Sequence, residues 1–181
     1  MFSLVNKKAV ITGGGSGIGK AIAVTFAAQG AEVHVLELTT EAGADTAATI
    51  KLAGGQVSVH ACNVANKDEV NKVFASIGAI DILVNNAGVA HIGKADTTPE
   101  ADFDRVMSIN VKGVYQCIAA AIPGFRANGS GVIINMASIA AWVGLADRFV
   151  YSTAKGAVMA MTLSVAKDYM HENIRCNSIS P

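Results

Sequence analysis

The chain has 181 residues, a length that suits one domain with a continuous hydrophobic core. Hydrophobic residues make up 51% and charged residues 15% of the sequence, which excludes a disordered chain. Lysine plus arginine and aspartate plus glutamate each number 14, so the charge balance gives no reason to expect a nucleic-acid partner. We therefore expect residues 1–181 to form a single domain.

Three features bear on the cellular location. The first eight residues place their charges after a short apolar stretch, whereas a signal peptide has the reverse order and a longer apolar region. No apolar run approaches the roughly 18 residues of a membrane-spanning helix. The cysteines, Cys62, Cys117 and Cys176, are odd in number and lack CxxC spacing, which is typical of free thiols in a reducing compartment. These features predict a cytoplasmic protein with no membrane partner.

Short apolar runs rich in β-branched residues alternate with longer amphipathic stretches along the whole chain. The runs predict six strands, at Lys8–Thr12, Glu32–Leu36, Gln56–Ala61, Ile82–Asn85, Gly131–Met136 and Ile174–Ile179. The stretches between them predict helices at Gly17–Gln29, Glu41–Leu52, Lys67–Ile77, Glu100–Ile122, where a break is possible, and Ser152–His171.

Several predicted strands are apolar at every position rather than at alternate positions. Ala9-Val10-Ile11 and Val132-Ile133-Ile134 have this pattern, which is typical of strands covered by helices on both faces. The regular alternation predicts the α/β class, with a three-layer, doubly wound parallel sheet and right-handed crossovers. Such sheets bind ligands at the carboxyl ends of their strands, near the point where the strand order reverses.

Capping residues support the predicted helix ends. Asn66, with Glu69 three residues later, has the form of a capping box, and Gly30 stands where a helix often ends. The Thr98 hydroxyl is expected to cap a helix that has Pro99 in its first turn.

A glycine-rich turn follows the first predicted strand and opens the first predicted helix. It has the spacing TGxxxGxG over Thr12–Gly19, which differs from the GxGxxG fingerprint. Glycines let the backbone approach a pyrophosphate closely, and a helix N-terminus offers it free N–H groups and a partial positive charge. The turn therefore predicts a dinucleotide site with contacts from Gly13, Gly15, Ser16, Gly17, Ile18 and Gly19.

Glu37 falls directly after the second predicted strand, 18 residues beyond Gly19. A carboxylate at this position can accept both ribose hydroxyls of NAD but repels the 2′-phosphate of NADP. The next residue, Leu38, brings no positive charge that would neutralise such a phosphate. We therefore expect NAD rather than NADP, the alternative being that Glu37 only caps a loop in water.

Tyr151 and Lys155 form a YxxxK pair. Residues four apart lie on one face of a helix, so the Lys155 ammonium is expected near the Tyr151 phenol. A nearby positive charge favours a phenolate, which can act as a general base and, in the reverse direction, as a general acid. The motif is frequent by chance, so its weight depends on what surrounds it.

Two further groups of residues end predicted strands at the same carboxyl edge as the glycine turn. Ser138 ends the fifth strand, where its hydroxyl can hydrogen-bond a substrate carbonyl and hold it against Tyr151. Asn85-Asn86-Ala87-Gly88 ends the fourth strand, where small residues let a cofactor lie close. Each group alone is ordinary at a strand end, but together they define a cleft.

With these motifs the chain resembles the short-chain dehydrogenase/reductase family, of NAD(P)-binding Rossmann type, over essentially its whole length. The carriers are TGxxxGxG, NNAG at Asn85–Gly88, and a serine 13 residues before the tyrosine of YxxxK. The resemblance implies that Ser138, Tyr151 and Lys155 are catalytic, as is Asn110, an asparagine thought to bend its helix and hold a water that links Lys155 to solvent. The alternative for Asn110 is a helix break with a locally bonded side chain.

The resemblance also implies cofactor contacts beyond the glycine turn. The family position that touches adenine is usually an aspartate, and here it is Asn63, so we expect an altered contact with the base. Further cofactor contacts are implied for Val64, Asn86, Ala87, Gly88, Tyr151, Lys155 and Pro181.

The implied reaction transfers a hydride between NAD(H) and a secondary alcohol or ketone, with no metal. Candidate substrates are sugars, polyols and 3-oxoacyl thioesters, and no residue decides among them. His91, Ile92, Trp142 and Gly144 are candidates for lining the substrate pocket, His91 more plausibly as a loop residue than as a catalytic one. The alternative function is a non-catalytic dinucleotide-binding subunit, regulatory or structural.

The predicted helix from Ser152 is apolar around most of its axis. It therefore requires cover beyond one sheet, from a second subunit or from another part of the chain. Relatives pair through this helix and the preceding long one, which predicts a homodimer or homotetramer through residues 111–122 and 152–170. Relatives also continue beyond the position of Pro181 into a last strand and a substrate lid. Either the protein is longer than this sequence or it is a shortened form, and in a shortened form Ile174–Ile179 is expected to be an unprotected sheet edge.

Overall fold

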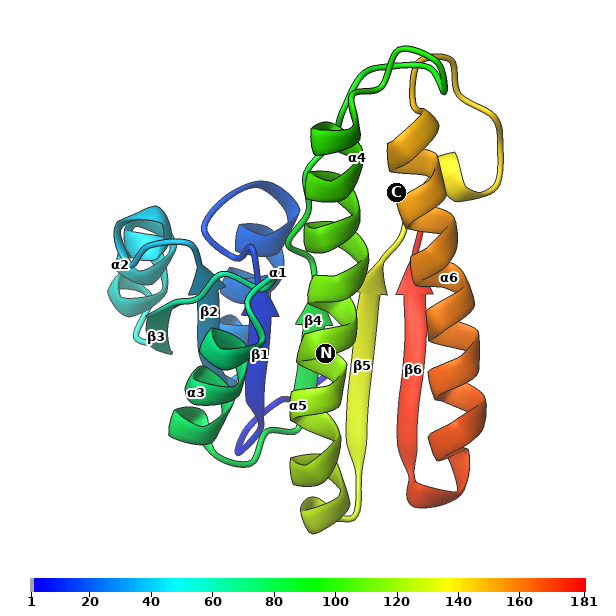
Figure 1. Cartoon of the computed structure of the whole chain (residues 1–181). Helices are drawn as coiled ribbons and strands as arrows, with labels where there is room; N and C mark the ends of the chain where they lie inside the picture. The colour runs from blue at the N-terminus through cyan, green and yellow to red at the C-terminus, as the bar shows by residue number, and fades with distance from the viewer. Residues whose placement is uncertain (1) are drawn as a thin grey trace.

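The computed structural model describes residues 2–181 and contains one six-stranded sheet. Its strands are β1 (Lys8–Thr12), β2 (Glu32–Glu37), β3 (Gln56–Ala61), β4 (Ile82–Asn85), β5 (Gly131–Met136) and β6 (Ile174–Ile179) (Figure 1). All pairings are parallel, and the order is β3-β2-β1-β4-β5-β6. The order reverses between β1 and β4, which confirms the doubly wound sheet and puts its switch point between these two strands.

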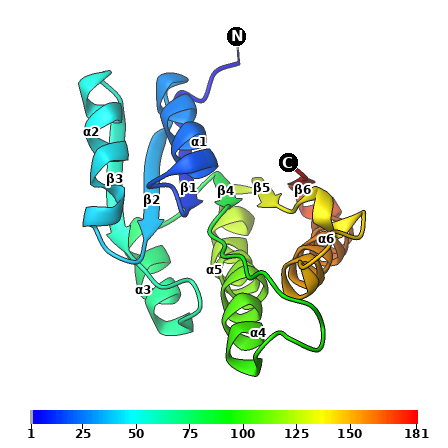
Figure 2. The same cartoon turned by 90° about the horizontal axis from the view of Figure 1, so that it is seen from above.

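Helices cover both faces of the sheet. On one face lie α1 (Gly17–Ala28) and α2 (Ala44–Leu52), and on the other lie α3 (Lys67–Ile77), α5 (Gly113–Asn128) and α6 (Phe149–Tyr169) (Figure 2). Val10 of β1 belongs to the core beneath α3 and α5, whereas its neighbour Ile11 belongs to the core beneath α1. The run Ala9–Ile11 is therefore buried on both faces, as predicted, whereas in the β5 run Val132–Ile134 only Ile133 is buried, and Val132 and Ile134, which face the α1 side of the sheet, are half-buried.

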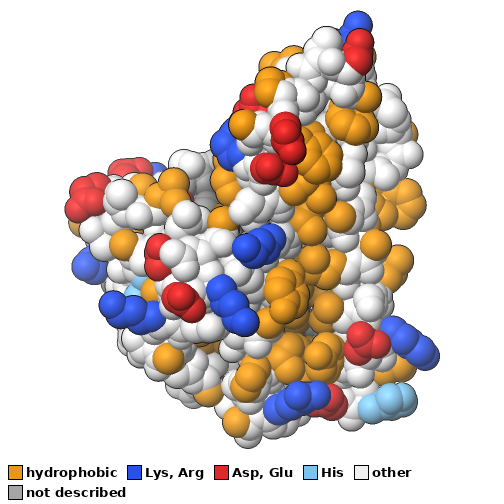
Figure 3. Space-filling view, in the orientation of Figure 1, with side chains coloured by type: hydrophobic (Ala, Val, Ile, Leu, Met, Phe, Trp, Pro, Cys, Tyr) orange, Lys and Arg blue, Asp and Glu red, His pale blue; other side chains and the backbone are white. Residues whose placement is uncertain are grey.

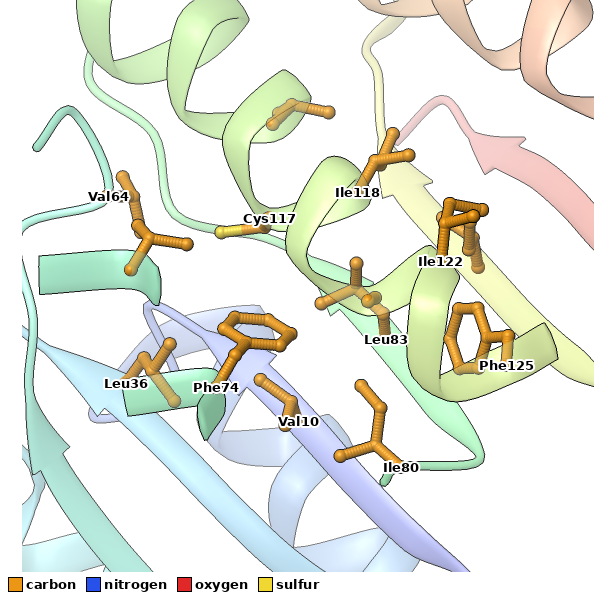
Figure 4. Close-up of a cluster of buried hydrophobic side chains, with 14 of the residues drawn as sticks. Val10, Leu36, Val64, Phe74, Ile80, Leu83, Cys117, Ile118, Ile122 and Phe125 are labelled. Carbon is orange, nitrogen blue, oxygen red and sulfur yellow. The ribbon is translucent and has the colours of Figure 1, made fainter. Parts of the chain in front are cut away.

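The larger core lies between the sheet and the helices α3 and α5. Phe125 and Ile118 of α5 face Leu83 and Val10 of the sheet, with Phe74 of α3 beside them (Figure 4). The three cysteines are free and buried here, and burial raises the pKa of Cys62 and of Cys176 to about 11 and that of Cys117 further. These thiols are packed in the core and stay protonated at neutral pH.

The long helix predicted over Glu100–Ile122 is broken and also extends further. Its first part is α4 (Glu100–Met107), a π-helical turn follows at Ser108–Lys112, and α5 then continues through Pro123 to Asn128. Proline lacks an N–H and crowds the preceding turn, so Pro123 locally disfavours this continuation. Phe125, which is fully buried, anchors the extra turns to the core, and this packing outweighs the local penalty.

Other element ends differ from the prediction by a few residues. The Asn66 side chain caps α3 by accepting the N–H groups of Asp68 and Glu69, as expected. Thr98 does not cap α4, because its hydroxyl donates to Lys94 O instead. Helix α6 begins at Phe149 rather than at Ser152, and the Phe149 N–H donates to Gly93 O. Tyr151 therefore lies inside the helix.

Within residues 2–181, one helical segment is long and apolar enough to cross a membrane by length and composition. It is Phe149–Glu172, with a mean hydropathy of 1.2. Lys155 and several serine and threonine residues interrupt this segment, so its sequence contains no continuous apolar run of the length that spans a membrane. The segment lies along β5 and β6, with Val150, Ala154 and Val158 buried, and its composition is that of a helix packed on a sheet.

Candidate active site

The loops after β1 and β4 are tied together at the switch point. The Thr12 hydroxyl oxygen accepts the N–H groups of Asn86 and Ala87, both at 3.0 Å. The Asn86 side-chain amide donates to the carbonyl oxygens of Thr12 and Gly13 at 3.1 and 2.8 Å. The glycine turn and the NNAG segment are therefore one hydrogen-bonded unit at the carboxyl edge of the sheet.

The glycine turn has the shape that a bound phosphate requires. Gly13 has a φ of +64°, and a Cβ on it would lie 2.8 Å from the Ala87 Cα, while a Cβ on Gly19 would lie 2.1 Å from Gly13 O. Helix α1 starts without a side-chain cap and without an acidic residue in its first turn, so its N–H groups have no side-chain acceptor. These features fit the pyrophosphate of a dinucleotide.

A cavity of about 430 Å³ opens beside this turn. It is lined by most of the predicted cofactor-binding residues, namely Gly13, Ser16, Gly17, Ile18, Glu37, Asn63, Val64, Asn86, Ala87 and Gly88. One oxygen of the Glu37 carboxylate accepts the Gly15 N–H at 2.7 Å. Glu37 is thus held at the cavity wall by the glycine turn, and its contact with a ribose stays a prediction.

Asn63 lies at the far end of this cavity, past the end of β3. Its side-chain oxygen accepts the Ala65 N–H at 3.0 Å, and its own N–H donates to Glu69 at 2.8 Å. Part of the side chain is therefore already bonded to local backbone, and its contact with an adenine base stays a prediction.

A second cavity, of about 240 Å³, adjoins the first and shares Ile18, Asn86, Gly88 and Val89 with it. Ser138, Tyr151, Lys155 and Pro181 line this second cavity. The Ser138 hydroxyl oxygen accepts the Ala140 N–H at 3.3 Å, and no residue of the described chain accepts its hydroxyl hydrogen. The three residues that carry the predicted chemistry therefore face one space next to the dinucleotide cavity.

Lys155 is buried beneath this second cavity, with 6% of its surface exposed. Its Nζ donates to Met136 O at 2.6 Å and lies 5.6 Å from the centroid of the Tyr151 ring. Burial lowers the pKa of Lys155, because a charged ammonium is poorly solvated there. The expected closeness of ammonium and phenol on one helix face is confirmed.

Asn110 lies in the π-helical turn and lines neither cavity. Its side chain exchanges two hydrogen bonds with the backbone of Val89, which lines both. The expected break in the helix is present. The alternative of a locally bonded side chain is wrong, because the partner is 21 residues away. Whether Asn110 holds a water for Lys155 stays a prediction.

Some cavity residues did not figure in the motifs. Each directly flanks a motif at a strand end or belongs to the π-helical turn: Leu36, Leu38, Cys62, Val89 and Ile109 in the larger cavity, and Ala90, Met136 and Ala137 in the smaller. Conversely, His91, Ile92, Trp142 and Gly144 line neither cavity, and the Trp142 indole N–H donates to the Ser180 hydroxyl at 3.3 Å. The His91 Nδ1 lies 3.6 Å from the Oδ2 of Asp102 in α4, so the His91 ring is turned toward that helix.

A depression of about 710 Å³, larger than either of these two cavities, lies at the opposite edge of the sheet, where the strands begin. Lys7, Lys8 and Asp81 line it, but the Lys7 ammonium bonds Asp81 at 2.9 Å and the Lys8 ammonium donates to Ile77 O at 3.0 Å. Its charges are already paired within the chain, and we assign the site to the carboxyl edge.

Comparison with known proteins agrees with this geometry. The family model of short chain dehydrogenases matches residues 7–181. A 2-(R)-hydroxypropyl-CoM dehydrogenase from Xanthobacter autotrophicus is 41% identical over 98% of this chain and 74% of its own length.

Two solved structures have nearly the same fold. An NAD⁺-bound xylitol dehydrogenase superimposes with a TM-score of 0.96 at 32% identity, over 99% of this chain and 71% of its own. A metagenomic short-chain oxidoreductase in complex with NADP superimposes with a TM-score of 0.95 at 31% sequence identity. The match covers 99% of this chain and 84% of that one. The chain therefore belongs to the short-chain dehydrogenase/reductase family of oxidoreductases, which use a nicotinamide dinucleotide on a Rossmann sheet.

Proposed function

We propose that the protein interconverts a secondary alcohol and its ketone with NAD(H), and that Tyr151 is the acid/base. The observation that carries this proposal is the shared cavity of Ser138, Tyr151 and Lys155, which adjoins the dinucleotide cavity through four common residues. A pure binding protein has no need of this arrangement.

The protein's part in the reaction is orientation and proton handling. When bound, the nicotinamide accepts or supplies the hydride. In the oxidation direction the Tyr151 phenolate takes the proton of the substrate hydroxyl, while the Ser138 hydroxyl donates a hydrogen bond to the same substrate oxygen. Lys155, fixed by Met136 O, holds its Nζ 5.6 Å from the centroid of the Tyr151 ring and so orients the ammonium group beside the phenol that handles the proton. Reduction reverses each proton step.

NAD is the proposed cofactor because of Glu37. The carboxylate lines the larger cavity, and only one of its oxygens is bonded within the described chain, to the Gly15 N–H. The other oxygen is placed to accept ribose hydroxyls, and the negative charge opposes a 2′-phosphate. The NADP-bound relative shows that the fold also accepts the phosphorylated form, so this preference rests on Glu37 itself.

The proposed substrates are polyols, sugars or 3-oxoacyl thioesters. Xylitol dehydrogenase and 2-(R)-hydroxypropyl-CoM dehydrogenase are named for hydroxyl-bearing substrates, which agrees with an alcohol in the smaller cavity. A cavity of about 240 Å³ has room for the reacting end of such a molecule.

We also propose that two copies pair through α5 and α6. Apolar side chains gather over these helices on one face of the molecule (Figure 3). Tyr115 of α5 and Leu163 of α6 are 54% and 71% exposed, and exposed apolar side chains that gather in one patch mark an interaction surface.

A panel of polyols, sugars, simple secondary alcohols and their ketones, and 3-oxoacyl thioesters tests the proposal, with NADH absorbance as the readout. We expect turnover by the wild type and at least a hundredfold loss in Tyr151→Phe. Tyr115→Phe, outside both cavities, is the control; it keeps the aromatic ring that the proposed subunit contact uses, and we expect full activity. Equal turnover by the wild type and Tyr151→Phe would remove Tyr151 from the mechanism, and NADH binding without any turnover would favour the regulatory alternative.

A further inference from the structure

Thr46 lies in the first turn of α2, outside every motif of the sequence. It is completely buried, and its hydroxyl lies 3.0 Å from both Gly14 O and Gly15 O. These two carbonyls belong to the middle of the glycine turn. The single hydroxyl hydrogen of Thr46 is therefore shared, as a three-centre hydrogen bond, between the carbonyls of two consecutive peptide groups of the turn.

Fixing a carbonyl also fixes the N–H group on the other side of the same peptide plane. The peptide unit is planar and trans, so its C=O and N–H point in opposite directions. The Gly14 carbonyl shares its unit with the Gly15 N–H, which donates to Glu37 at 2.7 Å. The Gly15 carbonyl shares its unit with the Ser16 N–H, and Ser16 lines the dinucleotide cavity. Thr46 thus aims one N–H at the ribose-binding carboxylate and the other toward the phosphate side.

The packing leaves little room for another arrangement. A Cβ on Gly15 would lie 2.2 Å from Ala42 O and 2.8 Å from the Glu37 carboxylate. A Cβ on Gly43, just before α2, would lie 2.6 Å from the Val59 side chain of β3. The start of α2 is therefore fixed to the sheet, and the turn rests directly on it.

We propose that Thr46 is a positioning residue for the cofactor, which keeps the glycine turn in its binding conformation before a dinucleotide arrives. Thr46 does not line the cavity and acts only through Gly14 and Gly15. Glycine-rich turns have many accessible conformations, so a turn that is already ordered loses less entropy on binding. The inference rests on the proposed dinucleotide site and adds a residue of α2 to it.

Titration of NADH fluorescence with Thr46→Val tests the proposal. Valine has nearly the shape of threonine but cannot donate to the two carbonyls. We expect NADH to bind roughly threefold to tenfold more weakly, the effect of one hydrogen bond, with KM for the cofactor raised and kcat at saturation unchanged. Thr46→Ser restores the hydroxyl and is expected to restore the affinity.

Thr49→Val is the matched control on the same helix. Thr49 is half-buried, and its hydroxyl donates to Asp45 O of its own helix at 2.8 Å and not to the glycine turn. This variant is expected to bind NADH as the wild type does. Thr46→Ala is measured alongside, because it removes the hydroxyl without placing a methyl group against the carbonyls.

Each result has a separate meaning. Unchanged affinity in both Thr46→Val and Thr46→Ala overturns the role of Thr46, and so does an equal loss in Thr49→Val. If neither Thr46→Val nor Thr46→Ala folds while Thr46→Ser is native by circular dichroism, the hydroxyl serves folding and the proposal is wrong. Failure of the wild type to bind NADH instead refutes the dinucleotide site of the proposed function, and this inference with it.

Discussion

Asn110 and Val89 exchange two hydrogen bonds of 2.8 Å, in which the Asn110 amide oxygen accepts the Val89 N–H and its nitrogen donates to Val89 O. Asn110 is 1% exposed and occupies the π-helical turn between α4 and α5. A π-helical turn carries one extra residue and interrupts the regular ladder, a feature frequent at functional sites. Here it presents an asparagine to the loop that walls both cavities.

We expect Asn110→Leu to lower the free energy of unfolding by roughly 1–3 kcal/mol, because two part-buried backbone groups of Val89 lose their partner. NADH binding should weaken as well, since Val89 lines both cavities. Asn128→Leu, in the last turn of α5, loses one bond to Ile80 O and serves as the control, with a smaller destabilisation and normal binding. Urea denaturation and NADH titration measure the two effects. Similar results for the two variants would rule out a special role for Asn110.

The parts of the fold set by local pattern could be predicted from the sequence. All six strands lie where apolar runs end in turn residues, and the glycine turn and YxxxK pair depend on short spacings that tertiary structure leaves intact. Helix α5 passes Pro123 because the core beneath Phe125 overrides a local preference. The bond between Asn110 and Val89 joins residues that no spacing rule relates. The same holds for the bonds from Thr46 to the glycine turn.

Glu37→Gln should shift the cofactor preference toward NADP. Glutamine keeps an oxygen that can accept the Gly15 N–H but removes the charge that repels a 2′-phosphate. Two charges about 5 Å apart near a protein surface interact by a few kcal/mol before salt screening, so we expect the ratio of NADP to NAD affinity to rise roughly tenfold or more.

Calorimetric titration with both cofactors measures this ratio. Glu41→Gln removes an exposed carboxylate that does not line the cavity, and it should leave the ratio unchanged. Tighter binding of NADP than of NAD by the wild type would refute the assignment of Glu37.

The pair His34 and His60 should make the fold sensitive to mild acid. The rings are stacked, and their facing nitrogens lie 2.9 Å apart, while the other His34 nitrogen lies 2.9 Å from the Glu32 carboxylate. Burial lowers the pKa of both histidines. For His34, the Glu32 carboxylate partly opposes this shift by raising the pKa, and the Lys8 ammonium lowers the pKa further. The unfolded chain therefore binds these protons more readily than the folded one, and stability falls as the pH drops below about 6.5 toward the lowered values.

Denaturation midpoints between pH 7.5 and pH 5 test this dependence. His34→Gln, which cannot titrate, should flatten the slope, while replacement of the exposed His171 by asparagine should not. A slope that His34→Gln and His171→Asn leave equally steep would show that other groups are responsible.

The apolar face over α5 and α6 should hold two copies of the chain together. Leu163 is 71% exposed in the second half of α6, whose other apolar residues spread around the helix, and only 28% of the most apolar stretch of this helix is buried within one chain. In a two-fold interface each substitution acts twice, so Leu163→Glu places two carboxylates in one apolar contact. Buried interface side chains commonly contribute about 2 kcal/mol or more, which corresponds to at least a thirtyfold weaker association.

Leu52→Glu is the matched control, because Leu52 is 93% exposed on α2, on the other face of the sheet. Sedimentation equilibrium should find the wild type and Leu52→Glu associated and Leu163→Glu dissociated. Two results would contradict this prediction: a wild type that sediments as a monomer, or a Leu163→Glu variant that associates as tightly as an associating wild type. In either case this face is not the subunit contact and α6 is covered in another way.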